Sequence, residues 1–348
     1  MELKASTREQ VNVAASVLAS GGLVAFPTET VYGLGADAMN EGAVRRVFEL
    51  KGRPSRNPLI VHVSSIAMAQ RCVAPGAWDA RAQRLADAFW PGPLTMVLLK
   101  AGSVLDVVTG GGQSVALRMP AHPIALALID ALGSPLVGPS ANVSGHVSPT
   151  TAAHVLADFG SRVMVLDGGA CRAGIESTVV SLRAGEPARV LRQGVVTPGQ
   201  IAAALGEPMP PQAETHERPA AASDAASSEP LQSPGMLDRH YAPRSATERV
   251  RWGDWASVRA IIEREQGRVG VLCFTTPPSD IERAALVESL GEHPEPAAAR
   301  LYGALRTLDA ESPSVIAIEV PSLDTGRSDD ERALWAAIRD RLWRATER

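Results

Sequence analysis

The chain has 348 residues, with 34 basic and 38 acidic side chains and a formal net charge of −4. At about 100–200 residues per domain, this length predicts about two domains, each large enough to bury a core. Hydrophobic residues make up 45% and charged residues 21% of the chain, which excludes a wholly disordered or fibrous protein. No apolar run approaches the roughly 18 residues of a membrane span, and the first residues lack a signal pattern. With three widely spaced cysteines, the composition predicts a cytoplasmic protein with no disulfide framework and no contact with a membrane.

The charge is distributed unevenly along the chain. Residues 1–206 carry 17 basic and 14 acidic side chains, a net charge of +3, whereas residues 207–348 carry 17 and 24, a net charge of −7. A mildly basic first part suits an anionic ligand such as a nucleotide. It is too weakly charged to indicate a nucleic-acid surface by itself.

The first 206 residues mix patterns typical of helices and of strands. Apolar residues at helical spacing predict helices over 7–19, 42–50, 77–89 and 123–132. Short apolar runs predict strands at 23–26, 59–63, 94–99, 114–119, 136–138, 163–167, 177–182 and 188–192. The irregular order and the many proline and glycine breaks favour an open α/β domain with a mixed, twisted sheet, flanking helices and a concave active-site face.

A proline-rich stretch separates this part from the rest of the chain. Residues 207–235 contain six prolines but no aromatic and no β-branched aliphatic residue. Such a segment cannot bury enough apolar surface to offset its ordering entropy. We therefore expect a catalytic domain over 1–206, a linker or lid over 207–240 and a C-terminal domain over 241–348.

The C-terminal part shows a more regular alternation of elements. We expect strands at 268–274 and 315–320 and helices at 282–290, 296–308 and 329–345. This pattern predicts a smaller, Rossmann-like α/β domain with a mainly parallel sheet between two helical layers.

Three polar loops, the first and third of them after predicted strands, are the candidate site. They read PTETVYGLG at 27–35, KGRPSRNP at 51–58 with His62 behind it, and PSANVSG at 139–145 with SPT at 148–150. Cations and hydroxyls on loops restrained by glycine and proline can hold phosphates and a small ligand. Arginine fills 31 of the 34 basic positions, so Lys51 is conspicuous in the second loop. Taken alone, the first loop is better interpreted as a turn and the third as a helix N-cap with turns, whereas for the second a solvated basic loop is an equally good interpretation.

Several common catalytic signatures do not occur in the sequence. It contains no GxxxxGK[ST] loop, no GxSxG elbow and no HExxH motif. Covalent nucleophilic catalysis and a built-in metal site are therefore not expected.

Taken together, the motifs resemble the L-threonylcarbamoyladenylate synthase family. The resemblance rests on PTETVYGLG, KGRPxxNP with His62, the SAN loop with SPT, GIESTVV and VLRQG, and covers residues 10–200. PGMLDRHYAP at 234–243 resembles the hinge into the extra C-terminal domain of the family's long form. The resemblance implies ATP-dependent condensation of L-threonine with bicarbonate or CO₂ to give threonylcarbamoyl-AMP and pyrophosphate. This is the first step of N6-threonylcarbamoyladenosine formation at position 37 of tRNAs that read codons beginning with A.

The resemblance also implies roles for particular residues. The catalytic tetrad would be Lys51, Arg53, Ser140 and Asn142. ATP would be contacted by Arg53, Asn57, Ser114, Ser140, Ser148, Arg192 and Tyr241, and L-threonine by Thr30, His62, Arg118, Gly138 and Ser177. Mg²⁺ would be bound through the nucleotide. The expected partners are the downstream tRNA threonylcarbamoyl-transferase machinery, with tRNA itself as a further candidate.

Three alternatives remain open at this stage. A carbamoyltransferase of the hydrogenase-maturation type also makes an acyl adenylate, but that family carries cysteine-rich zinc-finger segments and this sequence has no CxxC pair. An RNA-binding or translation-accessory module would use the basic face without catalysis. Tyr241 is expected to reach the nucleotide, and residues 207–235 are expected to cross the mouth of the site as a lid. In the alternative interpretation, Tyr241 only anchors the second domain.

Overall fold

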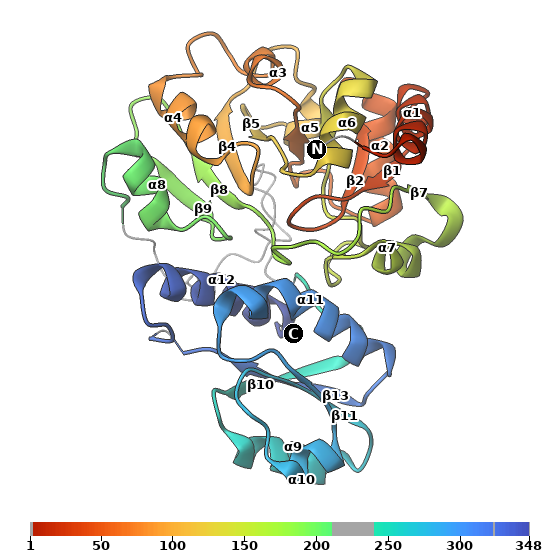
Figure 1. The fold of residues 1–348 in the computed structure, drawn as a ribbon, viewed down its shortest axis with the longest axis vertical. Helices are drawn as coiled ribbons and strands as arrows, with labels where there is room; N and C mark the ends of the chain where they lie inside the picture. The colour runs from red at the N-terminus through yellow and green to blue at the C-terminus, as the bar shows by residue number, and fades with distance from the viewer. Residues whose placement is uncertain (1–2, 211–239, 323, 348) are drawn as a thin grey trace.

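The computed structural model describes residues 3–210, 240–322 and 324–347. These residues form two β-sheets, each with its own helices, one above the other in Figure 1. Nearly all of the expected linker, and with it the expected lid over 207–235, lies outside the described residues. The boundaries at 206 and 241 therefore stay a prediction.

Within the described residues the first sheet has nine strands in the order β7-β1-β2-β6-β3-β5-β4-β8-β9. Their bounds are β1 (Val24–Phe26), β2 (Gly33–Asp37), β3 (Ile60–His62), β4 (Leu94–Leu99), β5 (Ser114–Arg118), β6 (Leu136–Val137), β7 (Met164–Val165), β8 (Thr178–Ser181) and β9 (Arg189–Arg192). Neighbouring strands pair parallel at β1–β7, β3–β5 and β4–β8 and antiparallel elsewhere. The mixed sheet expected from the sequence is thus confirmed.

The helices of the first part are short and mostly capped by side chains. They are α1 (Ala5–Ala19), α2 (Glu41–Lys51), α3 (Ile66–Arg71), α4 (Ala80–Phe89), α5 (Asp106–Thr109), α6 (Pro123–Leu132), α7 (Ala152–Phe159) and α8 (Pro198–Leu205), with a 3₁₀ turn at Gly160–Arg162. In α2, the Asn40 side chain accepts a hydrogen bond from the Ala43 N–H, and Gly52 ends the helix in the left-handed conformation. This cap orients the loop after α2, which carries the KGRP motif.

One sheet face is covered by helices and the other carries polar side chains. Side chains alternate between the two faces of a strand, and Val61 and Leu117 belong to the main core beneath the helices. Their neighbours His62 and Arg118 lie on the opposite face and pair directly in the β3–β5 ladder. That ladder brings together two predicted threonine contacts that are 56 residues apart in sequence.

The second sheet is parallel throughout, in the order β10-β13-β11-β12. Its elements are β10 (Ala246–Arg251), α9 (Trp255–Glu265), β11 (Val269–Cys273), α10 (Ser279–Ala284), β12 (Leu286–Ser289), α11 (Pro294–Ala310), β13 (Val315–Val320) and α12 (Asp329–Ala345). Apolar side chains of α9 and α10 pack on one face and those of α11 and α12 on the other. The three-layer α/β domain is confirmed.

The prediction of a helix over 282–290 was wrong. The helix α10 ends at Ala284, and Leu286–Ser289 forms the edge strand β12, which pairs in parallel with β11. A run of four residues is too short for periodicity to separate a strand from a helix, so the tertiary pairing decides.

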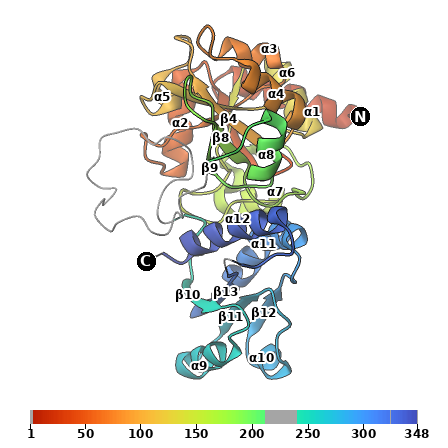
Figure 2. The same ribbon diagram turned by 90° about the vertical axis from the view of Figure 1, so that its left-hand side faces the viewer.

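The helices α11 and α12 lie between the second sheet and the first domain, whereas α9 and α10 lie on the far side (Figures 1 and 2). Arg306 of α11 bonds to the Asp158 carboxylate at 2.7 Å, and the Thr197 hydroxyl donates to Asp330 of α12. The two domains are thus joined by direct polar contacts. Among the described residues, none of the helices has the length and apolar character of a membrane span.

Candidate active site

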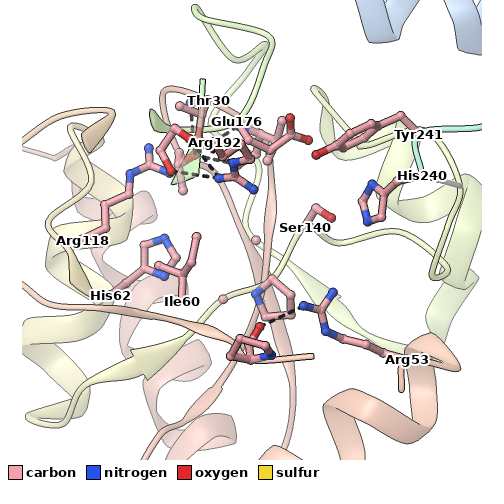
Figure 3. A pocket seen from close by; sticks show the side chains of 17 residues that line it. Thr30, Arg53, Ile60, His62, Arg118, Ser140, Glu176, Arg192, His240 and Tyr241 are labelled. Atoms are coloured by element: carbon pink, nitrogen blue, oxygen red, sulfur yellow. Dashed lines mark hydrogen bonds between the residues drawn. The ribbon is translucent and has the colours of Figure 1, made fainter. Parts of the chain in front are cut away.

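A polar cavity lies on the face of the first sheet that the helices leave uncovered. His240 and Tyr241, at the start of the second domain, form part of its wall. Its empty volume, including space open to solvent, is about 560 Å³. In Figure 3, Arg118 and His62 lie on the left, His240 and Tyr241 on the right, Ser140 between them, and Arg53 below. The lining residues are Thr28, Thr30, Val31, Gly33, Arg53, Pro58, Ile60, His62, Arg118, Gly138, Pro139, Ser140, Glu176, Ser177, Arg192, His240 and Tyr241.

Arg118 is held rigidly at the end of β5. Its Nη2 lies 2.7 Å from Oε1 of Glu29, and its Nε donates to the Gly92 carbonyl at 3.2 Å. Both charged side chains are buried. The second Glu29 oxygen accepts a hydrogen bond from the Ala121 N–H. Glu29 is a residue whose role we did not predict; it fixes the guanidinium and leaves its remaining nitrogen for a ligand.

His62 lies beside Arg118 as a neutral side chain. Burial, reinforced by the charge of Arg118, lowers the pKa of His62 to about 3. The ring is 5.5 Å from that of Phe26 in an edge-on contact, and among the described residues its Nδ1 has no hydrogen-bond partner. A Cβ on Gly138 would lie 2.8 Å from this nitrogen. Gly138 therefore has to be glycine for the imidazole to face the cavity.

Lys51 and Arg53 supply positive charge at the opposite end. Arg53 donates to the carbonyls of Asn57 and Pro58, at 3.3 and 2.9 Å. The Lys51 Nζ donates to the carbonyls of Ser140 and Asn142, at 2.6 and 2.5 Å. Burial lowers the pKa of Arg53 to about 10, and burial together with Arg53 lowers the pKa of Lys51 well below its usual value. Carbonyl dipoles do not neutralise the Arg53 guanidinium, and an anion placed here would favour the charged form of Lys51, so this end suits an anion.

Ser177 directly precedes the strand β8, and Arg192 is the last residue of β9. The Ser177 hydroxyl lies 2.8 Å from that of Thr95, and Arg192 donates to the Ser177 carbonyl and hydroxyl. The neighbouring Glu176 lines the cavity and accepts a hydrogen bond from the Ser148 hydroxyl at 2.7 Å. Glu176 was not predicted; the only signal for it was its place in the GIESTVV motif.

Tyr241 closes the cavity from the side of the second domain. It is buried, with a φ of 61°, in the left-handed region that costs a residue with a side chain about 1 kcal/mol or more. The next residue, Ala242, donates its N–H to the Gly145 carbonyl at 2.9 Å, behind the SAN loop. A strained backbone that is held in place on both sides is typical of functional positions.

The predicted site residues fall into three groups. Nine line the cavity: Thr30, Arg53, His62, Arg118, Gly138, Ser140, Ser177, Arg192 and Tyr241. Four are buried behind the lining and bond to it or to its neighbours: Lys51, Asn57, Asn142 and Ser148. Ser114 pairs with Leu99 at the opposite end of β5 from Arg118, about 13 Å along the strand. All their assigned roles stay predictions.

The buried histidines make the fold sensitive to acid. The pKa of His62 is about 3 and that of His154 about 4 because burial disfavours their charged forms. The unfolded chain protonates them near pH 6.5, so it binds more protons than the native state below that pH. The contribution of these histidines to the free energy of unfolding is therefore fully present above about pH 6.5. It is lost as the pH falls from 6.5 toward their native pKa values. For His62, which is fully buried, we expect chemical denaturation to show a loss of about 1.4 kcal/mol per pH unit, and His62→Gln to remove that contribution. His154 is half-buried and is expected to contribute less.

Comparison with known proteins agrees with this architecture. Residues 16–194 match a family model for Sua5, YciO and YrdC described as telomere recombination, and residues 196–346 match one described as the threonylcarbamoyl-AMP synthase C-terminal domain. The threonylcarbamoyl-AMP synthase of Pyrococcus abyssi is 41% identical over 345 residues, covering 97% of this chain and 94% of that protein. The one from Bacillus subtilis is 40% identical, covering 94% and 93%.

A solved structure extends the likeness to the fold. The crystal structure of Pyrococcus abyssi Sua5 complexed with L-threonine superposes with a TM-score of 0.83 at 37% identity, covering 99% of this chain and 96% of that one. The fold and the cavity thus define a two-domain α/β enzyme that makes an adenylate, with ATP as a substrate. The chain belongs to the threonylcarbamoyl-AMP synthase family, in its long form.

Proposed function

We propose that the cavity is where L-threonine, bicarbonate or CO₂, and ATP react to give threonylcarbamoyl-AMP and pyrophosphate. The observation that carries this proposal is the separation of its two ends. One end offers a fixed arginine and small hydroxyls, and the other offers buried cations next to a serine–asparagine loop. An amino acid and a triphosphate need these two environments.

The threonine end is the wall that contains Arg118. Its remaining guanidinium nitrogen suits the carboxylate of the amino acid. Thr30 lies at the tip of a tight turn in which the Thr28 hydroxyl donates to the Val31 carbonyl at 2.6 Å. Because His62 is neutral, it adds no repulsion toward the amine of threonine, which must lose its proton before it attacks CO₂. Ser177 completes the wall.

The phosphate end is the wall that contains Arg53 and Ser140. The Asn57 side-chain amide is buried and, among the described residues, its oxygen and nitrogen have no partner. Buried polar groups are nearly always paired, so an unpaired amide beside Arg53 points to a missing ligand. Lys51 holds the loop of Ser140 and Asn142 in place through its two carbonyl contacts. We place the triphosphate against this loop.

The chemistry follows from this placement. The amine of threonine and CO₂ give a carbamate with release of one proton, and a carbamate oxygen attacks the α-phosphorus of ATP. The bond between the α-phosphorus and the bridging oxygen breaks, and pyrophosphate leaves. The protein positions the reactants and stabilises developing negative charge, with no covalent nucleophile. Both carboxylates near the cavity are engaged by arginines, so Mg²⁺ would be carried on the phosphate oxygens.

The wider role is proposed on the same basis. The adenylate is a reactive acyl donor, which would be passed in the cytoplasm to the machinery that modifies adenosine 37 of tRNA. A module that only binds RNA would not need a buried cavity with two unlike ends. The cavity itself does not require direct contact between this chain and tRNA.

A pyrophosphate-release assay without RNA tests the proposed reaction. With ATP, L-threonine and bicarbonate together, we expect steady pyrophosphate release and a threonine-containing adenylate detectable by mass spectrometry. Omission of any one substrate is expected to abolish both signals. L-serine, which lacks only the threonine methyl group, is a matched control that is expected to react more slowly. Release that requires tRNA, or that ignores threonine, would contradict the proposal.

A further inference from the structure

Glu176 links the cavity to the second domain. Its Oε1 accepts a hydrogen bond from Ser148 of the first domain. Its Oε2 accepts hydrogen bonds from the Tyr302 hydroxyl at 2.9 Å and from the Arg341 Nε at 3.3 Å. Tyr302 lies on α11 and Arg341 on α12, more than a hundred residues further along the chain. A carboxylate that lines the cavity is thus held by two donors from the other domain.

The same two side chains also hold Tyr241. The rings of Tyr302 and Tyr241 stack with centroids 5.6 Å apart and an interplanar angle of 23°, and the Arg341 guanidinium carbon lies 5.9 Å from the Tyr241 ring. Tyr302 and Arg341 are both 0% exposed. Each of them therefore touches two of the residues that form the cavity wall, although neither lines the cavity itself.

The backbone near Glu176 is seated directly on α11. Gly174 has a φ of 72°, and a Cβ there would lie 2.3 Å from the Ala298 carbonyl and 2.4 Å from the Cα of Ala299. Such a close approach is open only to glycine. The loop that carries Glu176 and Ser177 is therefore placed by the helix of the second domain as well as by its own strand.

The negative charge of Glu176 explains why its carboxylate needs the partners that the second domain supplies. A buried carboxylate is stable only when it is paired and hydrogen-bonded. Arg341 supplies the opposite charge, while Tyr302 and Ser148 fill further acceptor positions of Glu176. Burial and the nearby Glu176 raise the pKa of Tyr302 well above its ordinary value, so its hydroxyl stays protonated and remains a donor.

We propose that Tyr302 and Arg341 are positioning residues for adenylate formation, which fix Glu176, Ser148 and Tyr241 and so complete the ATP half of the cavity. This inference rests on the proposed location of ATP. The Ser177 hydroxyl, by contrast, has further contacts with Thr95 and Arg192 of the first domain. The second domain is then part of the nucleotide site, and its detachment would affect ATP more than threonine.

Tyr302→Phe gives the sharpest test because it removes one hydroxyl and keeps the ring that stacks on Tyr241. Loss of a hydrogen bond to a buried carboxylate is expected to raise the apparent KM for ATP about tenfold. The apparent KM for threonine is expected to change less than about threefold. The matched control is Asp330→Ala on α12, which breaks the interdomain hydrogen bond from Thr197 but touches no cavity residue. It is expected to leave both KM values unchanged.

Arg341→Met leaves Glu176 without its charge partner and is expected to unfold more readily. The double variant Arg341→Met/Glu176→Gln removes both charges and should restore the melting temperature while the KM for ATP stays raised. Unchanged KM values for ATP in both Tyr302→Phe and the double variant, with folded protein, would overturn the positioning role. If Arg53→Lys in the cavity also left the reaction unchanged, the proposed ATP site itself would be contradicted. Arg53→Lys therefore distinguishes failure of the ATP site from failure of the positioning role alone.

Discussion

Replacing Arg53 with lysine is expected to lower the rate of pyrophosphate release on the order of 10²–10³-fold, although the charge is kept. The planar guanidinium donates to two carbonyls on one side, and its fork can reach two phosphate oxygens at once. A compact ammonium cannot do both. Lys51→Ala is expected to lower the rate comparably for a different reason, because it releases the Ser140–Asn142 loop from the two carbonyl contacts. Steady-state kinetics at saturating substrates measures both effects.

The matched control is Arg56→Lys in the same loop. Arg56 is partly exposed and does not line the cavity, so its replacement is expected to leave turnover within about twofold. Melting temperatures of all three variants separate a loss of catalysis from a loss of fold. Turnover near the wild-type value in both Arg53→Lys and Lys51→Ala would refute a role at the phosphates.

Replacing Arg118 with alanine is expected to raise the apparent KM for L-threonine about tenfold or more and to change that for ATP much less. A hydrogen bond between a guanidinium nitrogen and a carboxylate is worth about 1.5–3 kcal/mol, and about 1.4 kcal/mol corresponds to tenfold in affinity. Equal losses for ATP and threonine would contradict the assignment of this wall to the amino acid.

The ion pair with Glu29 calls for a control variant. Arg118→Ala leaves a buried carboxylate unpaired, which destabilises a protein by about 3–5 kcal/mol. The double variant Arg118→Ala/Glu29→Gln removes that carboxylate charge and is expected to fold more stably while its KM for threonine stays raised. Glu29→Gln alone keeps the guanidinium and should raise this KM less, through looser orientation of Arg118.

The sequence predicted best those features that depend on local patterns. The strands β3 and β5 were expected from apolar runs, and the loops after α2 and β6 from their glycine, proline and hydroxyl residues. The strand β2 was missed because GLGAD contains two glycines, which are depleted in strands. Packing explains the glycine at position 33, because a Cβ there would lie 2.7 Å from the Phe26 ring. Such a requirement exists only in the folded protein.

Contacts across long sequence separations could not be predicted. Glu29 is 89 residues from Arg118, and Glu176 is 126 residues from Tyr302 and 165 from Arg341. A single glutamate or tyrosine in a helix or loop carries no local sign of its partner. The burial of Lys51 could not be predicted either. Its sequence context indicates an accessible loop cation, but its side chain is buried against two carbonyls.

A structure of the chain with L-threonine and a non-hydrolysable ATP analogue tests the central claim most directly. We predict the threonine carboxylate at Arg118, with the hydroxyls of Thr30 and Ser177 nearby, and the triphosphate at Arg53 and the Ser140–Asn142 loop, with the Asn57 amide paired. The α-phosphorus should face the amine of threonine within the same cavity. Nucleotide bound elsewhere, or threonine and nucleotide in separate pockets, would contradict the account.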